Sequence, residues 1–239
     1  MVELVLAASA TALATGLGAI PVWLLGERAE RLKPGLTGLA AGVMSVAAIV
    51  GLLLPATREG SSGEVAAGLA VGIAFLLGVR AWLERPGGMP AGDRRTAALV
   101  FLVLLFHSLP EGFAIGTAYA SDTEGLGFFV VAAIAIQNIP EGTSVAIPME
   151  AAGIGHARQF WGAVLTSVPQ PVGAVLAYIL VGEISSLLPV SFAFAAGAML
   201  MLVIVELGPG RARAARPAWE LGAVIGAGAM LAISQALSI

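Results

Sequence analysis

Two hexapeptides of the same pattern place polar side chains in the middle of long apolar stretches. The first reads His-Ser-Leu-Pro-Glu-Gly at residues 107–112, and the second reads Gln-Asn-Ile-Pro-Glu-Gly at residues 137–142. Four residues advance an α-helix by about 400°, so His107 and Glu111 share one helix face, as do Gln137 and Glu141. Imidazole and carboxylate groups together suit Zn²⁺, Fe²⁺ or Mn²⁺ better than an alkali ion. The pattern predicts a divalent-metal site between two helices.

The composition indicates that these helices lie in a membrane. Of the 239 residues, 58% are hydrophobic and 11% are charged, whereas a soluble protein carries about 25% charged residues. The net charge is only −3, without a long charge run, which gives no support to a nucleic-acid partner. The absence of cysteine excludes disulfides and thiolate ligands. The lipid bilayer is therefore the expected environment.

Eight apolar stretches are long enough to cross a hydrocarbon core of about 30 Å, which takes about 20 helical residues. We expect one all-α integral membrane domain over residues 1–239, and no β-barrel, because short alternating segments are missing. The predicted spans are 4–25, 36–56, 65–83, 97–120, 126–149, 160–182, 187–207 and 218–239.

The basic residues predict an orientation, because short loops rich in Lys and Arg stay cytoplasmic. All of the 12 basic residues except Arg58 lie in or beside the odd-numbered loops. Both termini are therefore expected on the extracellular or periplasmic side.

The two glutamates need a compensating cation. Their spans are antiparallel, and Glu111 and Glu141 both lie close to the midplane, where a charged side chain costs from about 2.5 to more than 10 kcal/mol. Neither span contains Lys or Arg, so the cation is a proton or a metal. A protonated glutamate that bonds two helices is the simpler alternative for one such residue, but not for the repeated pattern. Pro110 and Pro140 are expected to kink their helices.

Three further residues are weaker candidates. Met44 lies near the middle of the second span, although a methionine there is more often a packing residue. Gln170, between Pro169 and Pro171, places an amide at the depth of the glutamates and is expected in a broken helix. Glu206 lies near the cytoplasmic end of the seventh span, where its side chain could reach water.

With these motifs in view, the chain resembles the ZIP (Zrt/Irt-like) family of divalent-metal transporters, most closely its GufA-like branch. Residues 14–19, 41–44 and 197–200 also look like the family's pattern. The resemblance implies an eight-helix ZIP-like bundle that moves zinc, and often iron, manganese or cadmium, toward the cytoplasm.

The resemblance also implies a two-metal centre bridged by the two glutamates. The first site would use Met44, His107, Glu111, Gln137 and Glu141. The second site would use Ser108, Glu111, Asn138, Glu141 and Glu206.

This chain departs from the family pattern in ways that bear on the second site. Ser108 stands where relatives often have Asn, Asn138 where some have Asp, and Gln170 where many have Glu. The second site is therefore less charged here, and metal selectivity is not inherited with the resemblance.

Transport of a divalent metal is the function that these residues favour. A carrier of another substrate that uses Glu111 and Glu141 as proton relays is the alternative. An intramembrane metal hydrolase is disfavoured, because catalytic zinc usually has several His ligands, and only His107 and His156 are present. We expect a multi-pass protein of the inner cell membrane that is not an enzyme, has no prosthetic group and binds its cargo ion. A homodimer is left open.

Overall fold

The computed structural model describes residues 1–83, 93–208 and 215–239, apart from the side chains of residue 27 and of residues 93–100. Every regular element in this part of the chain is helical. Five of the residues on which the predicted orientation depends lie outside the described side chains: Arg85, Arg94, Arg95, Arg211 and Arg213.

Within each described stretch of the chain, the helices follow one another with short connections. They are α1 (Val2–Leu17), α2 (Ala19–Leu25), η1 (Gly26–Leu32), α3 (Lys33–Val46), η2 (Ala47–Leu53), α4 (Leu54–Glu59), α5 (Ser62–Leu83), α6 (Asp93–Ala120), α7 (Leu126–Ala151), α8 (His156–Thr166), α9 (Pro169–Glu183), η3 (Ser185–Leu187), α10 (Leu188–Leu202), η4 (Val203–Leu207) and α11 (Arg216–Leu237). Segments η2 and η4 are π-helical, and η1 and η3 are 3₁₀ helices.

The predicted number of spans is confirmed, because the described residues contain eight helices long and apolar enough to cross a membrane. Each observed span overlaps one predicted range. The observed spans are Val2–Leu25, Arg28–Glu59, Ser62–Leu83, Phe101–Ala120, Leu126–Ala151, His156–Glu183, Ser185–Leu207 and Arg216–Leu237.

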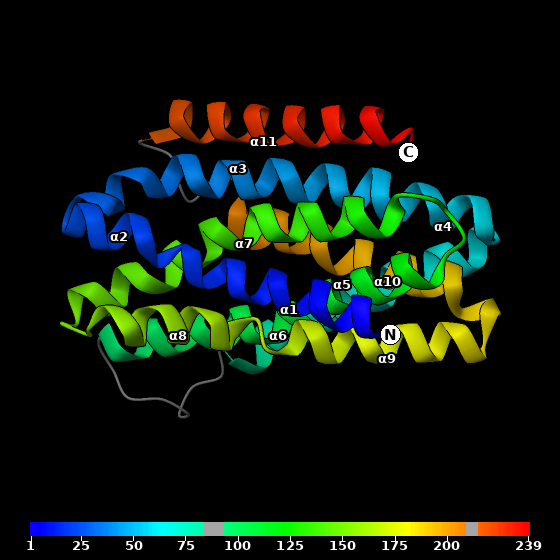
Figure 1. The fold of residues 1–239 in the computed structure, drawn as a ribbon, viewed down its shortest axis with the longest axis horizontal. Coiled ribbons are helices and arrows are strands. Elements are labelled where there is room, and N and C mark those ends of the chain that lie inside the picture. Colours follow the sequence, from blue (N-terminus) through cyan, green and yellow to red (C-terminus); the bar gives the residue numbers. More distant parts are fainter. Residues whose placement is uncertain (84–92, 209–214) are drawn as a thin grey trace.

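The helices lie side by side along the long axis of the molecule (Figure 1). The most extensive contacts join α3 with α11, α5 with α10, α6 with α9 and α1 with α7. Helix α7 also contacts α3, α6 and α8, so it occupies the interior of the bundle. The second hexapeptide is therefore surrounded by other helices.

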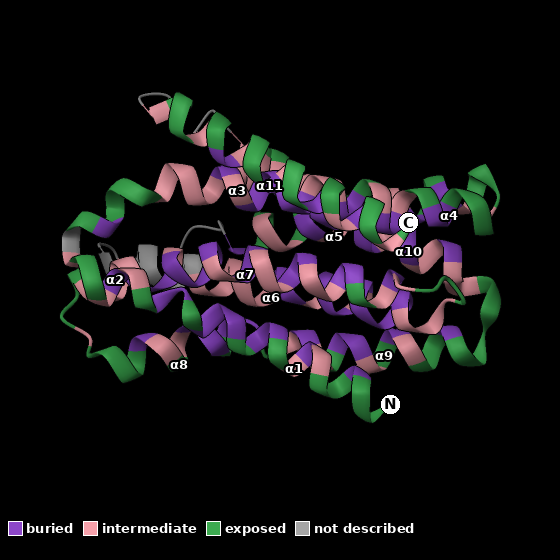
Figure 2. Cartoon of the chain, turned by 45° about the horizontal axis from the view of Figure 1, so that its top comes forward, coloured by how far each residue is buried: buried purple, intermediate pink, exposed green. Residues whose placement is uncertain are grey.

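The burial pattern suits a bilayer. Large apolar side chains such as Leu24, Val224 and Ile204 are at least 70% exposed, and exposed residues follow the outer helix faces, whereas buried residues face inward (Figure 2). Buried polar residues include His107 and Glu111. Large apolar groups thus lie on the outer faces, and a set of polar side chains is enclosed within the bundle, as is expected of membrane helices that carry a polar site.

Candidate metal centre

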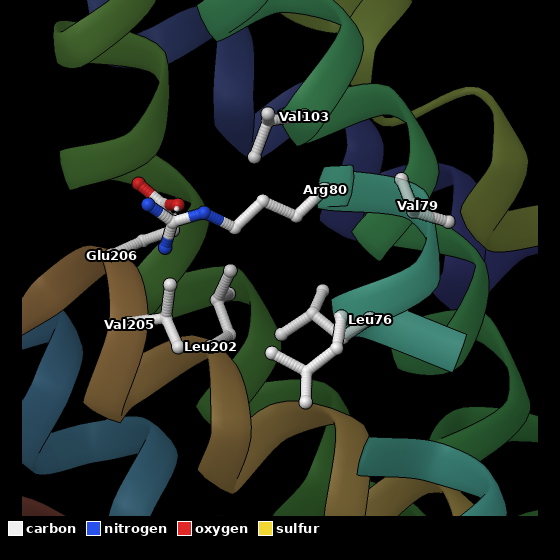
Figure 3. A pocket seen from close by; sticks show the side chains of 8 residues that line it. Leu76, Val79, Arg80, Val103, Leu202, Val205 and Glu206 are labelled. Atoms are coloured by element: carbon white, nitrogen blue, oxygen red, sulfur yellow. Dashed lines mark ion pairs between the residues drawn. The ribbon is translucent and has the colours of Figure 1, made fainter. Parts of the chain in front are cut away.

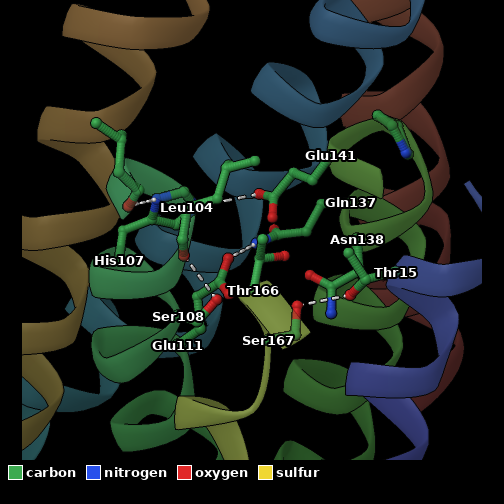
Figure 4. A network of polar contacts seen from close by, with 12 residues as sticks. Thr15, Leu104, His107, Ser108, Glu111, Gln137, Asn138, Glu141, Thr166 and Ser167 are labelled. Carbon is green, nitrogen blue, oxygen red and sulfur yellow. Dashed lines mark hydrogen bonds and ion pairs between the residues drawn. The ribbon is translucent and has the colours of Figure 1, made fainter. Parts of the chain in front are cut away.

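Three potential metal ligands converge between α6 and α7. Ligand atoms of His107, Glu111 and Glu141 all lie within 4.8 Å of one another. The exposed fractions of these side chains are 3%, 0% and 5%, respectively, and Figure 4 shows them pointing toward a common centre. The predicted meeting of the two hexapeptides is therefore realised in the fold.

His107 presents one ring nitrogen to this centre. Its Nδ1 lies 2.8 Å from the backbone oxygen of Val103, and because a carbonyl only accepts, the proton belongs on Nδ1. In the neutral imidazole Nε2 then carries the lone pair, and this nitrogen lies 3.6 Å from Glu141 Oε1. Two ligands of a tetrahedral zinc ion, each bonded at about 2.1 Å, are about 3.4 Å apart. The observed spacing therefore fits a shared ion with little movement, and the Val103 carbonyl holds the imidazole in the tautomer that binds metal.

Gln137 completes the group from α7. Its Nε2 donates to Glu111 Oε1 at 2.5 Å. Three buried atoms of the centre have no hydrogen-bond partner among the described residues: His107 Nε2, Gln137 Oε1 and Glu141 Oε1. A buried polar atom without a partner costs about 1–3 kcal/mol. A cation bound between His107 Nε2 and Glu141 Oε1, which lie 3.6 Å apart, would remove that cost for both atoms, so this pair suits an ion.

The glycine that ends each hexapeptide brings the helices together. A Cβ added at Gly142 would overlap the backbone oxygen of Thr15 on α1, and one added at Gly112 would overlap the backbone oxygen of Gln170 on α9. Only glycine permits these close contacts. Helices α6 and α7 continue through Pro110 and Pro140. Each Pro-Glu-Gly segment therefore supplies a ligand and, one residue later, a helix contact.

The sixth span is broken, as expected, beside the metal centre. Helix α8 ends at Thr166 and α9 begins at Pro169. This break places the Gln170 amide against Glu111, because Gln170 Nε2 lies 2.6 Å from Glu111 Oε2. The sequence placed Gln170 at the right depth but did not identify its partner.

Sequence reasoning missed the polar residues that α1 contributes. The Thr11 hydroxyl donates to Gln170 Oε1 at 2.8 Å, and the Thr15 hydroxyl lies 2.6 Å from the Ser167 hydroxyl. Thr11 and Thr15 are four residues apart in an apolar span and therefore share a helix face. The four-residue spacing of these two threonines is the feature of the sequence that could have identified them.

The structure does not bring every predicted ligand into the three-residue cluster. Ser108 donates to its own helix, at the Leu104 carbonyl, at 2.9 Å. Asn138 Nδ2 bonds to the backbone oxygen of Thr11 at 2.7 Å. Met44 is fully buried in the hydrophobic core, on a helix that contacts α7.

Glu206 lies in a separate polar contact. Its Oε1 forms an ion pair with Arg80 of α5 at 3.3 Å. Figure 3 shows the Arg80 side chain extending across a pocket toward Glu206, with Val103 on another side of the pocket. In this conformation Glu206 is bound to Arg80 rather than to the cluster.

Comparison with known proteins agrees with this geometry. The sequence profile of the family described as ZIP Zinc transporter matches residues 87–234. The chain belongs to the ZIP zinc transporter family. The resemblance drawn from the paired hexapeptides is confirmed, and membership of a transporter family confirms the prediction that the protein is not an enzyme.

Individual ZIP relatives match over most of this chain. Zinc transporter GufA of Myxococcus xanthus is 33% identical over 217 residues, which are 82% of this chain and 83% of the relative. Zinc transporter ZIPB of Bordetella bronchiseptica is 31% identical over 227 residues, which are 86% of this chain and 71% of the relative. A relative from Arabidopsis thaliana is 34% identical over 214 residues, 87% of this chain. The matched part is only 34% of that plant relative's length.

Proposed function

We propose that this ZIP protein carries zinc across the cell membrane toward the cytoplasm, through the centre formed by His107, Glu111, Gln137 and Glu141. The observation that carries the proposal is the set of three buried atoms without partners, on His107, Gln137 and Glu141. Two of them, on His107 and Glu141, lie 3.6 Å apart, close to the spacing of about 3.4 Å expected for neighbouring ligands of one zinc ion.

The chemistry of the ligands supports a divalent cargo. The two carboxylates, when ionised, carry two negative charges, and in a low-dielectric interior they need an equal positive charge nearby. One divalent ion supplies it. The imidazole favours Zn²⁺, with Fe²⁺, Mn²⁺ and Cd²⁺ as further cargoes, and the curated relatives GufA and ZIPB are called zinc transporters.

Several finer features belong to the same proposal. Met44 would add a thioether as the ion enters or leaves the first site, and the whole chain would act as one membrane domain with both termini outward, because the basic loops favour that orientation. Bacterial relatives named zinc transporter ZupT support placement in the cell membrane. A homodimer remains a prediction, which light scattering of the purified protein would check.

Uptake by proteoliposomes tests the proposal. Purified protein would be reconstituted in liposomes that contain a zinc-sensitive dye and a second, pH-sensitive dye. We expect saturable zinc entry, competition by other divalent ions and loss of entry in Glu111→Ala. Zinc entry at the rate of protein-free liposomes would refute the proposal, and metal-independent proton flux would favour a proton-coupled carrier of another substrate.

A further inference from the structure

The Gln170 amide lies fully buried between α6, α7 and α1, and every hydrogen-bonding position on it is occupied. Its Nε2 donates to Glu111 Oε2 at 2.6 Å and to Asn138 Oδ1 at 3.3 Å. Its Oε1 accepts from the Thr11 hydroxyl at 2.8 Å and from Asn138 Nδ2 at 3.1 Å. A primary amide has two donor hydrogens and two acceptor lone pairs, so Gln170 has none left for another partner.

The NH₂ group of Gln170 lies between two oxygens that the family resemblance assigns to a second metal. Its neighbours Glu111 Oε2 and Asn138 Oδ1 come from two different helices. The amide can take only one orientation there, because a carboxylate accepts hydrogen bonds and does not donate them. The N–H hydrogens therefore provide the positive partner that a cation would otherwise provide.

Two further side chains assigned to a second metal, Ser108 and Glu206, are also engaged. Ser108 donates to the Leu104 carbonyl, and Glu206 pairs with Arg80. At the first site, His107 Nε2 and Glu141 Oε1 have no hydrogen-bond partner among the described residues. Glu141 is assigned to both sites, but this oxygen lies on the side of His107, 3.6 Å from its Nε2. The two sites therefore differ: the first leaves atoms free to bind an ion, whereas oxygens of the second already accept hydrogen bonds from the Gln170 amide.

Charge balance leads to the same result. Glu111 and Glu141 are the only carboxylates in the ligand cluster of the described residues, and one divalent ion neutralises both. A second ion would add two positive charges without partners in a medium where an uncompensated charge costs several kcal/mol.

We propose that Gln170 makes this centre mononuclear: its amide occupies the place of the second metal, so that each chain binds one ion, at the first site. This inference rests on the proposed function and specifies the stoichiometry of its site. Gln170 is thereby a residue that determines what the centre accepts. Gln170→Glu, which exchanges the NH₂ group for an oxygen 2.6 Å from Glu111, should create the missing site.

Metal counting tests the inference without a transport assay. Detergent-purified protein would be titrated with Zn²⁺ by calorimetry, and its metal content would be measured by mass spectrometry after gel filtration. We expect one zinc ion per chain in the unmodified protein and two in Gln170→Glu. With Mn²⁺ in place of Zn²⁺, the electron paramagnetic resonance spectrum should show a spin-coupled pair only in Gln170→Glu.

Gln235→Glu is the matched control, because it adds the same charge at an exposed position on α11, and it should still bind one ion. Two ions in the unmodified protein would overturn the inference and leave the proposed function standing. No bound zinc at all would overturn both. One ion in a folded Gln170→Glu protein would show that a proton offsets the added carboxylate, which also refutes the inference. If Gln170→Glu fails to fold, the ion count of the unmodified protein decides alone.

Discussion

Replacement of Glu141 is expected to weaken zinc binding in two graded steps. Removal of one partner from a buried set of paired charges costs about 3–5 kcal/mol, and each 1.4 kcal/mol changes Kd about tenfold. Glu141→Gln removes the charge but keeps an oxygen 3.6 Å from the His107 imidazole, so we expect the lower value, about a hundredfold. Glu141→Ala removes charge and oxygen together, and Kd should rise by more than about a thousandfold.

The fold should survive both changes, because Glu141 Oε1 has no hydrogen-bond partner among the described residues that a substitution would leave unsatisfied. Thermal unfolding of the metal-free protein should shift little, and zinc affinity would be measured by competition with a chelating dye. Glu183→Gln, at an exposed position, is the matched control and should bind zinc normally. A Kd within threefold of the unmodified value in folded Glu141→Gln would refute the assignment of this ligand.

Three further predictions follow from the same geometry. His107→Ala should shift selectivity from Zn²⁺ toward Mn²⁺, because it removes the imidazole of the cluster. Competition uptake would measure the order in which the protein prefers the metal ions, and an unchanged order would exclude His107 as a ligand. Gly142→Ala should destabilise the fold by about 1–3 kcal/mol, because its Cβ would overlap the Thr15 carbonyl. Gly228→Ala is the control, since a Cβ there meets nothing within 4 Å, and equal melting temperatures of Gly142→Ala and Gly228→Ala would contradict the prediction. Zinc affinity should rise with pH, since imidazole and carboxylate bind metal only without their protons; calorimetry in buffers of different ionisation enthalpy would count the released protons, and a count of zero across the neutral range would contradict it.

The sequence predicted what depends on local pattern. Apolar length located the eight spans, and helical spacing placed His107 and Glu111 on one face. Hydrogen-bond partners could not be predicted, because they depend on how distant segments pack: Thr11 and Gln170 are 159 positions apart. The ion-pair partner of Glu206 could not be predicted for the same reason, because it depends on where α5 places Arg80. The break between α1 and α2 at Gly18 was also missed, since one glycine in an apolar span is no sufficient signal.

In each Pro-Glu-Gly segment the metal ligand and the glycine that contacts a neighbouring helix are adjacent residues. This adjacency restricts where insertions and deletions can be tolerated in the sequence. One inserted residue turns the rest of a helix by about 100°, so an insertion between Glu141 and Gly142 would rotate the glycine away from α1 while the carboxylate stayed in place. A compensating point mutation could restore either feature but not both. Insertions and deletions among homologues should therefore be confined to connections such as the one near Gly153, where an added Cβ meets nothing within 4 Å, and should be missing from residues 107–112 and 137–142.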